Sequence, residues 1–168
     1  MSDINLTEKQ FETDIEYSLL TYGGYKKGDL KAFDRVTALD TATLISFVKS
    51  TQPKLWEKYE TIYGTSCEKS FIERFCKEVK SLGLLSVLRH GFKDRGITFR
   101  VVYWKPETSI NQTAKEQYER NILHCTRQLH YSPNNQNSID IVLFVNGIPV
   151  VSMELKNQFT GQDADNAI

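Results

Sequence analysis

Three ionisable residues near the end of the sequence have types and spacing that could do metal-dependent chemistry. Glu154 and Lys156 lie two apart in SMELKN, and Asp140 opens the apolar run before it. Carboxylates bind hard cations such as Mg²⁺, which polarise a phosphodiester and activate water. A nearby lysine can orient that water or stabilise the negative transition state. The group is sufficient for phosphodiester hydrolysis, although such spacing is more often a surface ion pair.

The turn between the two strands decides whether these side chains meet. Asn146-Gly147 joins IDIVLFV to PVVSMELK and is a strong hairpin signal. A plain two-residue turn pairs Val145 with Ile148. Because side chains alternate along strands, that register puts Asp140 and Glu154 on opposite faces of the sheet.

An irregular turn gives the opposite result. A three-residue loop with a glycine bulge pairs Phe144 with Ile148 and puts Asp140 on the same face as Glu154. Only this register separates the charges, including the lysine, from an all-apolar face. Pro149 cannot donate to the ladder and also favours an irregularity. We therefore predict a bulged turn and one shared polar face.

Periodicity predicts the elements that position this hairpin. A first helix runs from Thr7, its expected N-cap, to Gly23-Gly24, with Phe11, Ile15 and Leu19 on one stripe. Further segments are expected as helices over 40–50, 53–63, 66–82 and 112–121, strands over 97–104 and 122–131, a polar connection over 26–37, and a last helix opening within 161–168. This order predicts a mixed α/β (α+β) fold with the polar group on an antiparallel hairpin.

Composition limits the classes of protein. With 168 residues, 40% of them hydrophobic, the chain is long enough for one domain with a real core. It has no long apolar run and no basic-then-apolar export signal at its start, so we expect a soluble, cytoplasmic protein without a membrane span. The three cysteines, Cys67, Cys76 and Cys125, lack the spacing of a zinc site and are expected to be free thiols.

The charge balance argues against an autonomous, tight nucleic-acid binder, because the net charge is zero. Residues 89–131 carry eight Lys or Arg against four acidic residues, whereas residues 132–168 carry one Lys against four. This pattern suits a cation site beside a phosphate-binding surface, but charge alone favours ordinary solvated faces. The histidines His90, His124 and His130 show no helical metal-binding pair and are expected to be structural.

Longer stretches carry a family resemblance. The block from Asn137 to Asn157, preceded by RQLHYS, closely resembles the N-terminal nuclease domain of the R (restriction and translocase) subunit of type I restriction enzymes. That domain belongs to the PD-(D/E)xK nuclease superfamily. The segments ISFVKSTQPKLWEKY, VLRHGFKDRG, YWKPETSIN and YERNILHCTRQLHYS extend the likeness over most of the chain.

The resemblance implies a role for each matching residue. Asp140 and Glu154 correspond to the family's metal-binding carboxylates, and Lys156 to its catalytic lysine, with the backbone carbonyl of Leu155 as a further metal ligand. Glu12 matches a carboxylate on the family's first helix that reaches the site through water. Arg127 and Gln128 match a family signature, and both DNA contact and support of the hairpin stay open as their roles.

The resemblance also implies an assembly. The fold would be a restriction-endonuclease-like core over residues 1–168 with a helical insert over 38–83, as a C-terminally truncated fragment of a larger subunit. Its implied cofactor is Mg²⁺. Its implied partners are double-stranded DNA and the methyltransferase and specificity subunits. ATP would act only through a motor, and no phosphate-binding loop of a motor occurs in the sequence.

Two other hypotheses for the function stay open. The chain could be another PD-(D/E)xK enzyme, such as a repair nuclease or a junction resolvase, which would act as a symmetric dimer. It could also be a non-catalytic docking module that keeps the fold. Gln158, where the family often has proline, is a small departure from the family pattern.

Overall fold

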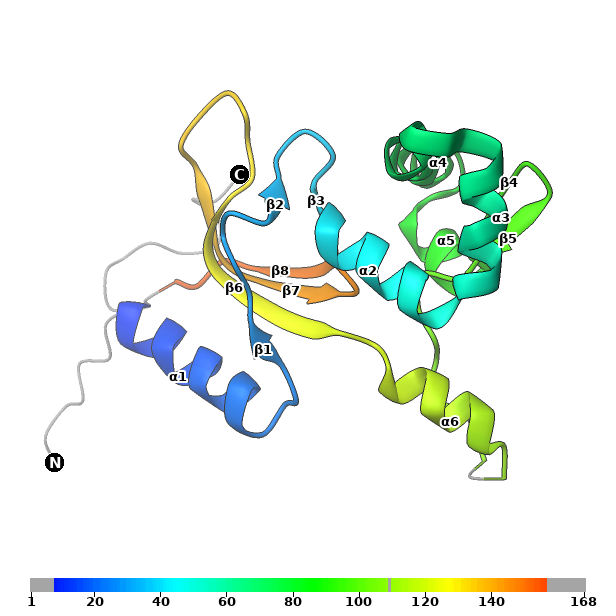
Figure 1. Cartoon of the computed structure of the whole chain (residues 1–168). Coiled ribbons are helices and arrows are strands. Elements are labelled where there is room, and N and C mark those ends of the chain that lie inside the picture. The colour runs from blue at the N-terminus through cyan, green and yellow to red at the C-terminus, as the bar shows by residue number, and fades with distance from the viewer. Residues whose placement is uncertain (1–7, 109, 157–168) are drawn as a thin grey trace, which may run out of the picture.

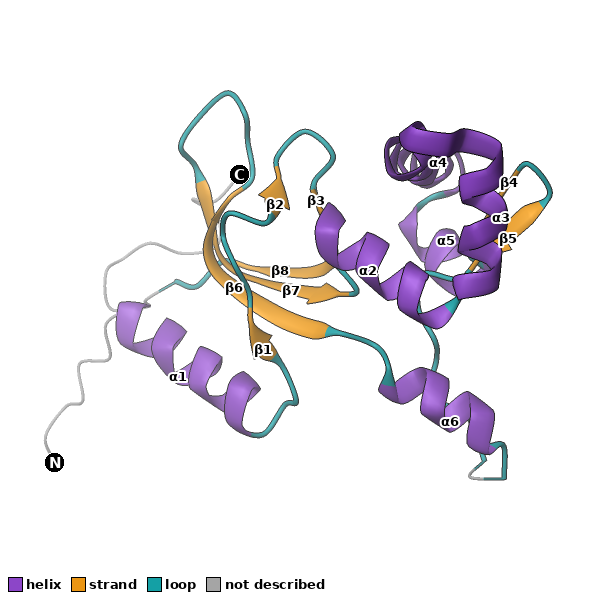
Figure 2. Cartoon of the chain, in the orientation of Figure 1, coloured by secondary structure: helices purple, strands orange, loops and turns teal. Residues whose placement is uncertain are grey.

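A computed structural model describes residues 8–108 and 110–156 (Figures 1 and 2). The helices are α1 (Glu8–Thr21), α2 (Thr41–Thr51), α3 (Pro53–Tyr63), α4 (Cys67–Leu82), α5 (Leu84–His90) and α6 (Gln112–Glu119), with the 3-10 helix η1 (Gly64–Ser66) between α3 and α4. The strands are β1 (Lys26–Lys27), β2 (Phe33–Asp34), β3 (Leu39–Asp40), β4 (Phe92–Asp94), β5 (Ile97–Phe99), β6 (Leu123–His130), β7 (Ser138–Val145) and β8 (Ile148–Met153). The predicted N-cap at Thr7 and the predicted last helix lie outside the described residues.

The main sheet has four strands in the order β1-β6-β7-β8. β1 runs parallel to β6, whereas β6, β7 and β8 pair antiparallel. The expected mixed α/β fold is therefore confirmed. α1 lies against β6, and helices α2 to α5 gather beyond one end of the sheet (Figure 1).

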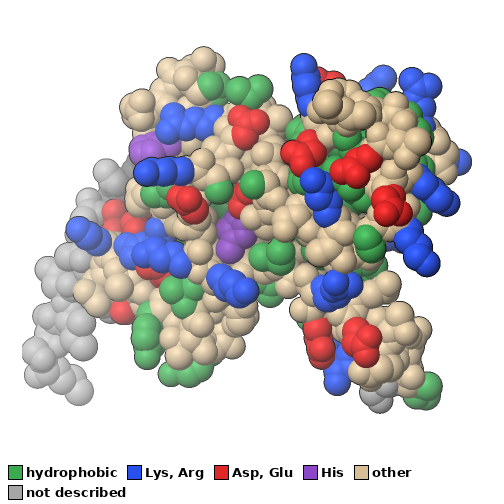
Figure 3. Space-filling view, in the orientation of Figure 1, with side chains coloured by type: hydrophobic (Ala, Val, Ile, Leu, Met, Phe, Trp, Pro, Cys, Tyr) green, Lys and Arg blue, Asp and Glu red, His purple; other side chains and the backbone are tan. Residues whose placement is uncertain are grey.

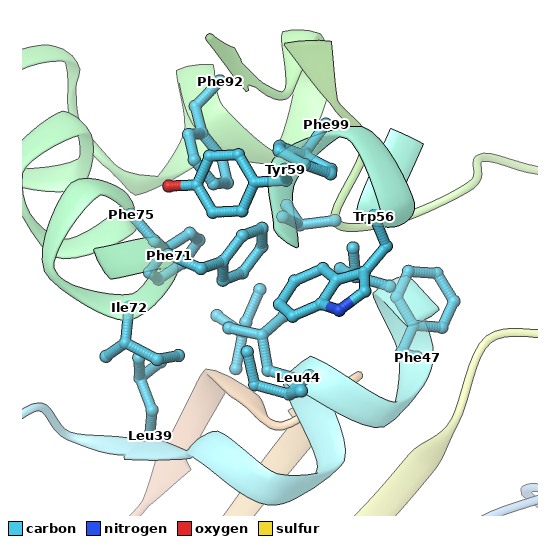
Figure 4. Packing of buried hydrophobic residues seen from close by; sticks show 14 of the residues in the cluster. Leu39, Leu44, Phe47, Trp56, Tyr59, Phe71, Ile72, Phe75, Phe92 and Phe99 are labelled. Atoms are coloured by element: carbon cyan, nitrogen blue, oxygen red, sulfur yellow. The ribbon is translucent and has the colours of Figure 1, made fainter. Parts of the chain in front are cut away.

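The gathered helices, together with the β4–β5 hairpin, form an aromatic module. The predicted helices at 40–50, 53–63 and 66–82 are confirmed within one residue as α2, α3 and α4. Their apolar faces meet around Phe71, which has no exposed surface (Figure 4). This core contains most of the fully buried side chains among the described residues. The proposed division into one domain with a helical insert stays a prediction.

The predicted strand over 97–104 is wrong in extent. Only Ile97–Phe99 is a strand, and it pairs with Phe92–Asp94 as a separate two-stranded sheet. α5 was also missed. The β-forming side chains there serve the aromatic module: Ile97 and Phe99 are buried in it, and Val101 follows them into the same core. The alternating apolar residues of this segment pack against the helices of the module, and the segment is not part of the main sheet.

The stripe predicted on the first helix is not its buried face. Phe11 is 47% exposed, and the buried residues of α1 are Glu12 and Glu16. The cause is Arg127 on β6, which faces α1 and pairs with both carboxylates. Likewise, the polar connection expected over 26–37 contains β1 and β2. These strands have two residues each, too few to carry a periodic signal.

The hairpin turn differs from the predicted bulged turn. Val145 pairs with Ile148 across a plain Asn146-Gly147 turn, in which both residues have positive φ (52° and 82°), as a type I′ turn requires. The turn is buried against the aromatic module. A Cβ added to Gly147 would lie 2.2 Å from the carbonyl oxygen of Asp40, so only glycine fits.

The irregularity lies one step further along β8. Phe144 pairs with Pro149, but Leu143 pairs with Val151, so Val150 is an extra residue on β8. Beyond this bulge Ile141 pairs with Met153. Odd-numbered residues of β7 therefore stand opposite odd-numbered residues of β8, which is the arrangement of faces that the bulged turn was predicted to give. The prediction was right in placing an irregularity beside the proline and wrong in placing it within the turn.

The surface carries mixed charge. Lys and Arg side chains lie over the region of β1, β6 and α1, interspersed with Asp and Glu, and the helical module shows both signs as well (Figure 3). This agrees with the zero net charge of the chain. Within the described residues, no helix combines the length and apolar character needed to cross a bilayer.

Candidate active site

Asp140 is the third residue of β7 (Ser138–Val145), an inner strand of the main sheet between β6 and β8. Its Oδ1 accepts a hydrogen bond of 3.1 Å from the Gln128 amide nitrogen. Its Oδ2 accepts one of 2.7 Å from the backbone N–H of Leu155, just beyond β8. Two strands and the segment after the hairpin therefore fix the orientation of this carboxylate.

The bulge at Val150 brings Glu154 towards Asp140. Extending the Ile141–Met153 register by one residue sets Asp140 opposite Glu154. Although Glu154 as a residue is exposed, partial desolvation of its carboxyl group and the charge of Asp140 raise its pKa. The charge of Lys156 acts on the same carboxyl group in the opposite direction. The charges of Asp140 and Lys156 therefore both act on the Glu154 carboxyl group.

The donor set fits a hard divalent cation. Among the described residues, the hydrogen bonds that Asp140 accepts come from neutral donors, an amide and a backbone N–H. Its negative charge is therefore available to an ion. No group of three or more His, Cys, Asp or Glu side chains in the described part of the chain has the arrangement of a metal site. Two carboxylates, completed by water and substrate phosphate, match the preference of Mg²⁺ better than a closed protein cage does.

A second group of polar residues lies behind Asp140. The Arg127 guanidinium donates to Glu12 Oε2 at 2.9 and 3.2 Å and to Glu16 Oε2 at 3.2 Å. The Gln128 amide nitrogen donates to Glu12 Oε1 at 2.9 Å as well as to Asp140. The structure therefore joins Glu12 to Asp140 through one intervening side chain, where the sequence suggested a link through water.

Glu16 was missed in the sequence. It stands one helical turn after Glu12, and both are buried, so the i, i+4 spacing of two glutamates was the available signal. Glu16 Oε1 is buried without a hydrogen-bond partner among the described residues, and Lys27 Nζ lies 3.8 Å from it. The two buried carboxylates behind the site are therefore paired with two cations, the Arg127 guanidinium and the Lys27 ammonium.

The Cys125 thiol lies near this group: burial and the charge of Glu16 raise its pKa, and Arg127 acts against that shift. The histidines make other contacts. His124 stacks on Phe144 with ring centroids 4.5 Å apart, and burial lowers its pKa, with Asp40 acting against that shift. His90 and His130 bond backbone carbonyls through Nδ1. The three cysteines are free, as expected.

The fold and this side-chain arrangement define a mixed α/β domain with paired carboxylates at the open end of a β-hairpin. The family described as "Type I restriction enzyme R protein N terminus" matches residues 5–168. The chain belongs to this family, and the resemblance drawn from its motifs is confirmed. No curated protein and no solved structure matches the chain.

Proposed function

We propose that this chain is a Mg²⁺-dependent endonuclease domain that cleaves double-stranded DNA as part of a type I restriction complex. The observation that carries the proposal is the meeting of Asp140 with the segment after β8, through the 2.7 Å bond from the Leu155 N–H. That bond supports the proposal because Glu154 and Lys156 are the chain neighbours of Leu155, whose backbone contacts the Asp140 carboxylate. Family membership makes a nuclease role plausible.

Each residue has a distinct task in this proposal. Asp140 and Glu154 bind the ion, with the Leu155 carbonyl as a further ligand. The bound ion would polarise the scissile phosphate and lower the pKa of an attacking water. Lys156 supplies a positive charge that orients the water or stabilises the charge developing on phosphate oxygens. Protons then leave through solvent, since the site is at the surface.

The mixed surface charge supports a domain that is delivered to DNA by partners. A duplex binder gains most of its non-specific affinity from neutralising phosphates, which a chain of zero net charge does poorly. In the proposed assembly, the methyltransferase and specificity subunits select the DNA and an ATP-driven motor moves it. The domain then needs only to engage the backbone at the point of cleavage.

The test is cleavage of a supercoiled plasmid by the complete restriction complex with ATP and Mg²⁺. We expect Asp140→Ala and Lys156→Ala to lower the cleavage rate by about a hundredfold to a thousandfold or more, while ATP hydrolysis and translocation continue. Glu57→Gln, on the exposed face of α3, is the matched control and should cleave as wild type does. Wild-type cleavage by the Asp140 and Lys156 variants would overturn the proposal and favour a docking module.

A further inference from the structure

Gln128 has a backbone conformation that is unusual for a strand. It lies inside β6 with φ of +49°, in the left-handed region that non-glycine residues seldom adopt. The β6–β7 ladder is regular on both sides, with Arg127 paired to Ile141 and Leu129 to Ile139, and lacks only the Gln128–Asp140 pair. The distortion is confined to the one position that stands opposite Asp140.

The distortion changes which way the side chains point. Consecutive residues of a regular strand face opposite sides of the sheet, yet Arg127 and Gln128 both donate to Glu12 on α1. Leu129, which would otherwise follow Arg127 on that side, packs instead with Val142 on the other. One left-handed residue therefore turns an extra polar side chain towards α1 and the site.

The Gln128 carboxamide is fully engaged. Its oxygen accepts a hydrogen bond of 2.9 Å from Ser138 Oγ, and its nitrogen donates to Glu12 Oε1 at 2.9 Å and to Asp140 Oδ1 at 3.1 Å. Only an N–H donor fits between two carboxylates, which fixes the amide orientation. A lysine or arginine here would neutralise Asp140, whereas an amide holds it and leaves its charge for an ion.

We propose that Gln128 is a positioning residue for the metal site, holding Asp140 in its metal-binding orientation and anchoring it through Glu12 to α1. The inference rests on the proposed function, because it needs Asp140 to be a metal ligand. Groups that hydrogen-bond to ligating carboxylates typically contribute ten- to a hundredfold to metal affinity or activity. The left-handed backbone is the feature that lets Gln128 reach both carboxylates.

Gln128→Gly is the sharpest variant, because glycine accepts the left-handed backbone while the whole side chain, with its carboxamide, is removed. We expect Mn²⁺ to bind ten- to a hundredfold more weakly by isothermal titration, with the thermal unfolding midpoint close to that of wild type. Gln128→Asn is the second variant, since asparagine tolerates the same backbone but is one methylene too short to reach Glu12 and Asp140 together. It should lose affinity similarly.

Arg95→Gly is the matched control, since Arg95 is also a non-glycine residue in the left-handed region (φ +47°) but lies in the β4–β5 turn of the aromatic module. It should bind Mn²⁺ as wild type does. Wild-type affinity in both Gln128 variants, with binding lost in Asp140→Ala, would overturn the positioning role and leave the metal site intact. If wild-type protein itself binds no Mn²⁺, the proposed metal site fails, and the positioning role fails with it.

Discussion

Asp94 and Asp140 are both partly buried carboxylates, but their surroundings differ. Asp94 lies in one half of the molecule, the aromatic module, and Asp140 in the other, the main sheet with α1. Asp94, in the aromatic module, accepts hydrogen bonds from the hydroxyls of Tyr59 at 2.8 Å and Tyr63 at 2.7 Å, and Arg74 Nε lies 3.9 Å from it. Its charge is met by phenols and a cation. Asp140 is held by an amide and a backbone N–H, which orient the carboxylate but bring no positive charge.

The two halves also differ in how they are stabilised. The aromatic module packs ring against ring, with centroids of Phe71 5.0 to 5.4 Å from those of Phe92, Phe99 and Trp56 (Figure 4). The main sheet has a small separate cluster around Val142, and its other face is closed by charged residues of α1. The comparison indicates that the module supplies stability and that the sheet holds groups poised for chemistry.

The largest expected effect tests the stabilising half. Phe71→Ala should lower the free energy of unfolding by about 3–5 kcal/mol, because a fully buried ring leaves a cavity among other rings. Urea denaturation measures this. Mn²⁺ affinity of the folded protein should not change. Ile110→Ala is the control, since Ile110 is 90% exposed and its truncation should cost less than about 0.5 kcal/mol. Equal stability of the two variants would contradict the assignment of the main core to this module.

The second prediction concerns the hairpin turn, through which the main sheet contacts the aromatic module. The fully buried Asn146 side chain accepts from the Ile122 N–H at 2.7 Å and donates to the carbonyl of Val101 at 2.8 Å and to Asn121 Oδ1 at 2.9 Å. Asn146→Gly keeps the left-handed turn but removes these bonds, and should cost about 2–3 kcal/mol because buried polar groups lose their partners.

The same variant tests whether the contacts of the turn also affect metal binding at the candidate site. If the turn only fastens the hairpin to the module, Mn²⁺ affinity in Asn146→Gly should equal that of wild type once the protein is folded. Asn134→Gly, in the exposed loop before β7, is the control and should change neither quantity. A loss of metal affinity without a loss of stability would contradict the separation of the two halves.

Local signals made three helices of the module, α2, α3 and α4, predictable. The Asp40 side chain accepts from the Thr43 N–H at the start of α2, Pro53 opens α3, and Gly83 ends α4. These capping residues act within a few positions of the ends they define, so the sequence reveals them directly.

The arrangement around the site depended on distant partners. Glu12 and Glu16 are buried because Arg127, more than a hundred residues further on, faces them. The apolar pattern of the hairpin predicted which residues share a face. It did not predict that Val150 is the extra residue, because the burial of the turn against Asp40 forces the two-residue turn. The periodicity of the sequence indicates neither the pairing of Arg127 with α1 nor the burial of the turn.

The smallest expected effect returns to Asp94. Burial alone would raise its pKa, but the hydrogen bonds from Tyr63 and Tyr59, with Arg74 nearby, lower it below the model-peptide value of 3.8. A carboxyl group whose pKa is lower in the folded state stabilises the fold above its unfolded pKa, and this contribution disappears as the pH falls through the folded value. Asp94→Asn should therefore cost about 1–2 kcal/mol at pH 7.

The pH dependence of that cost is the discriminating measurement. The difference in unfolding free energy between wild type and Asp94→Asn should be constant from pH 7 to about pH 5 and should shrink as the pH falls below 4, where the wild-type carboxyl group takes up a proton. Glu57→Gln, an exposed acid on α3, should show almost no difference from wild type at any pH. A cost of Asp94→Asn that does not change with pH would mean that the phenols stabilise the side chain by shape rather than by its charge. The contrast between a neutralised carboxylate in the module and an available one at the site would then no longer hold.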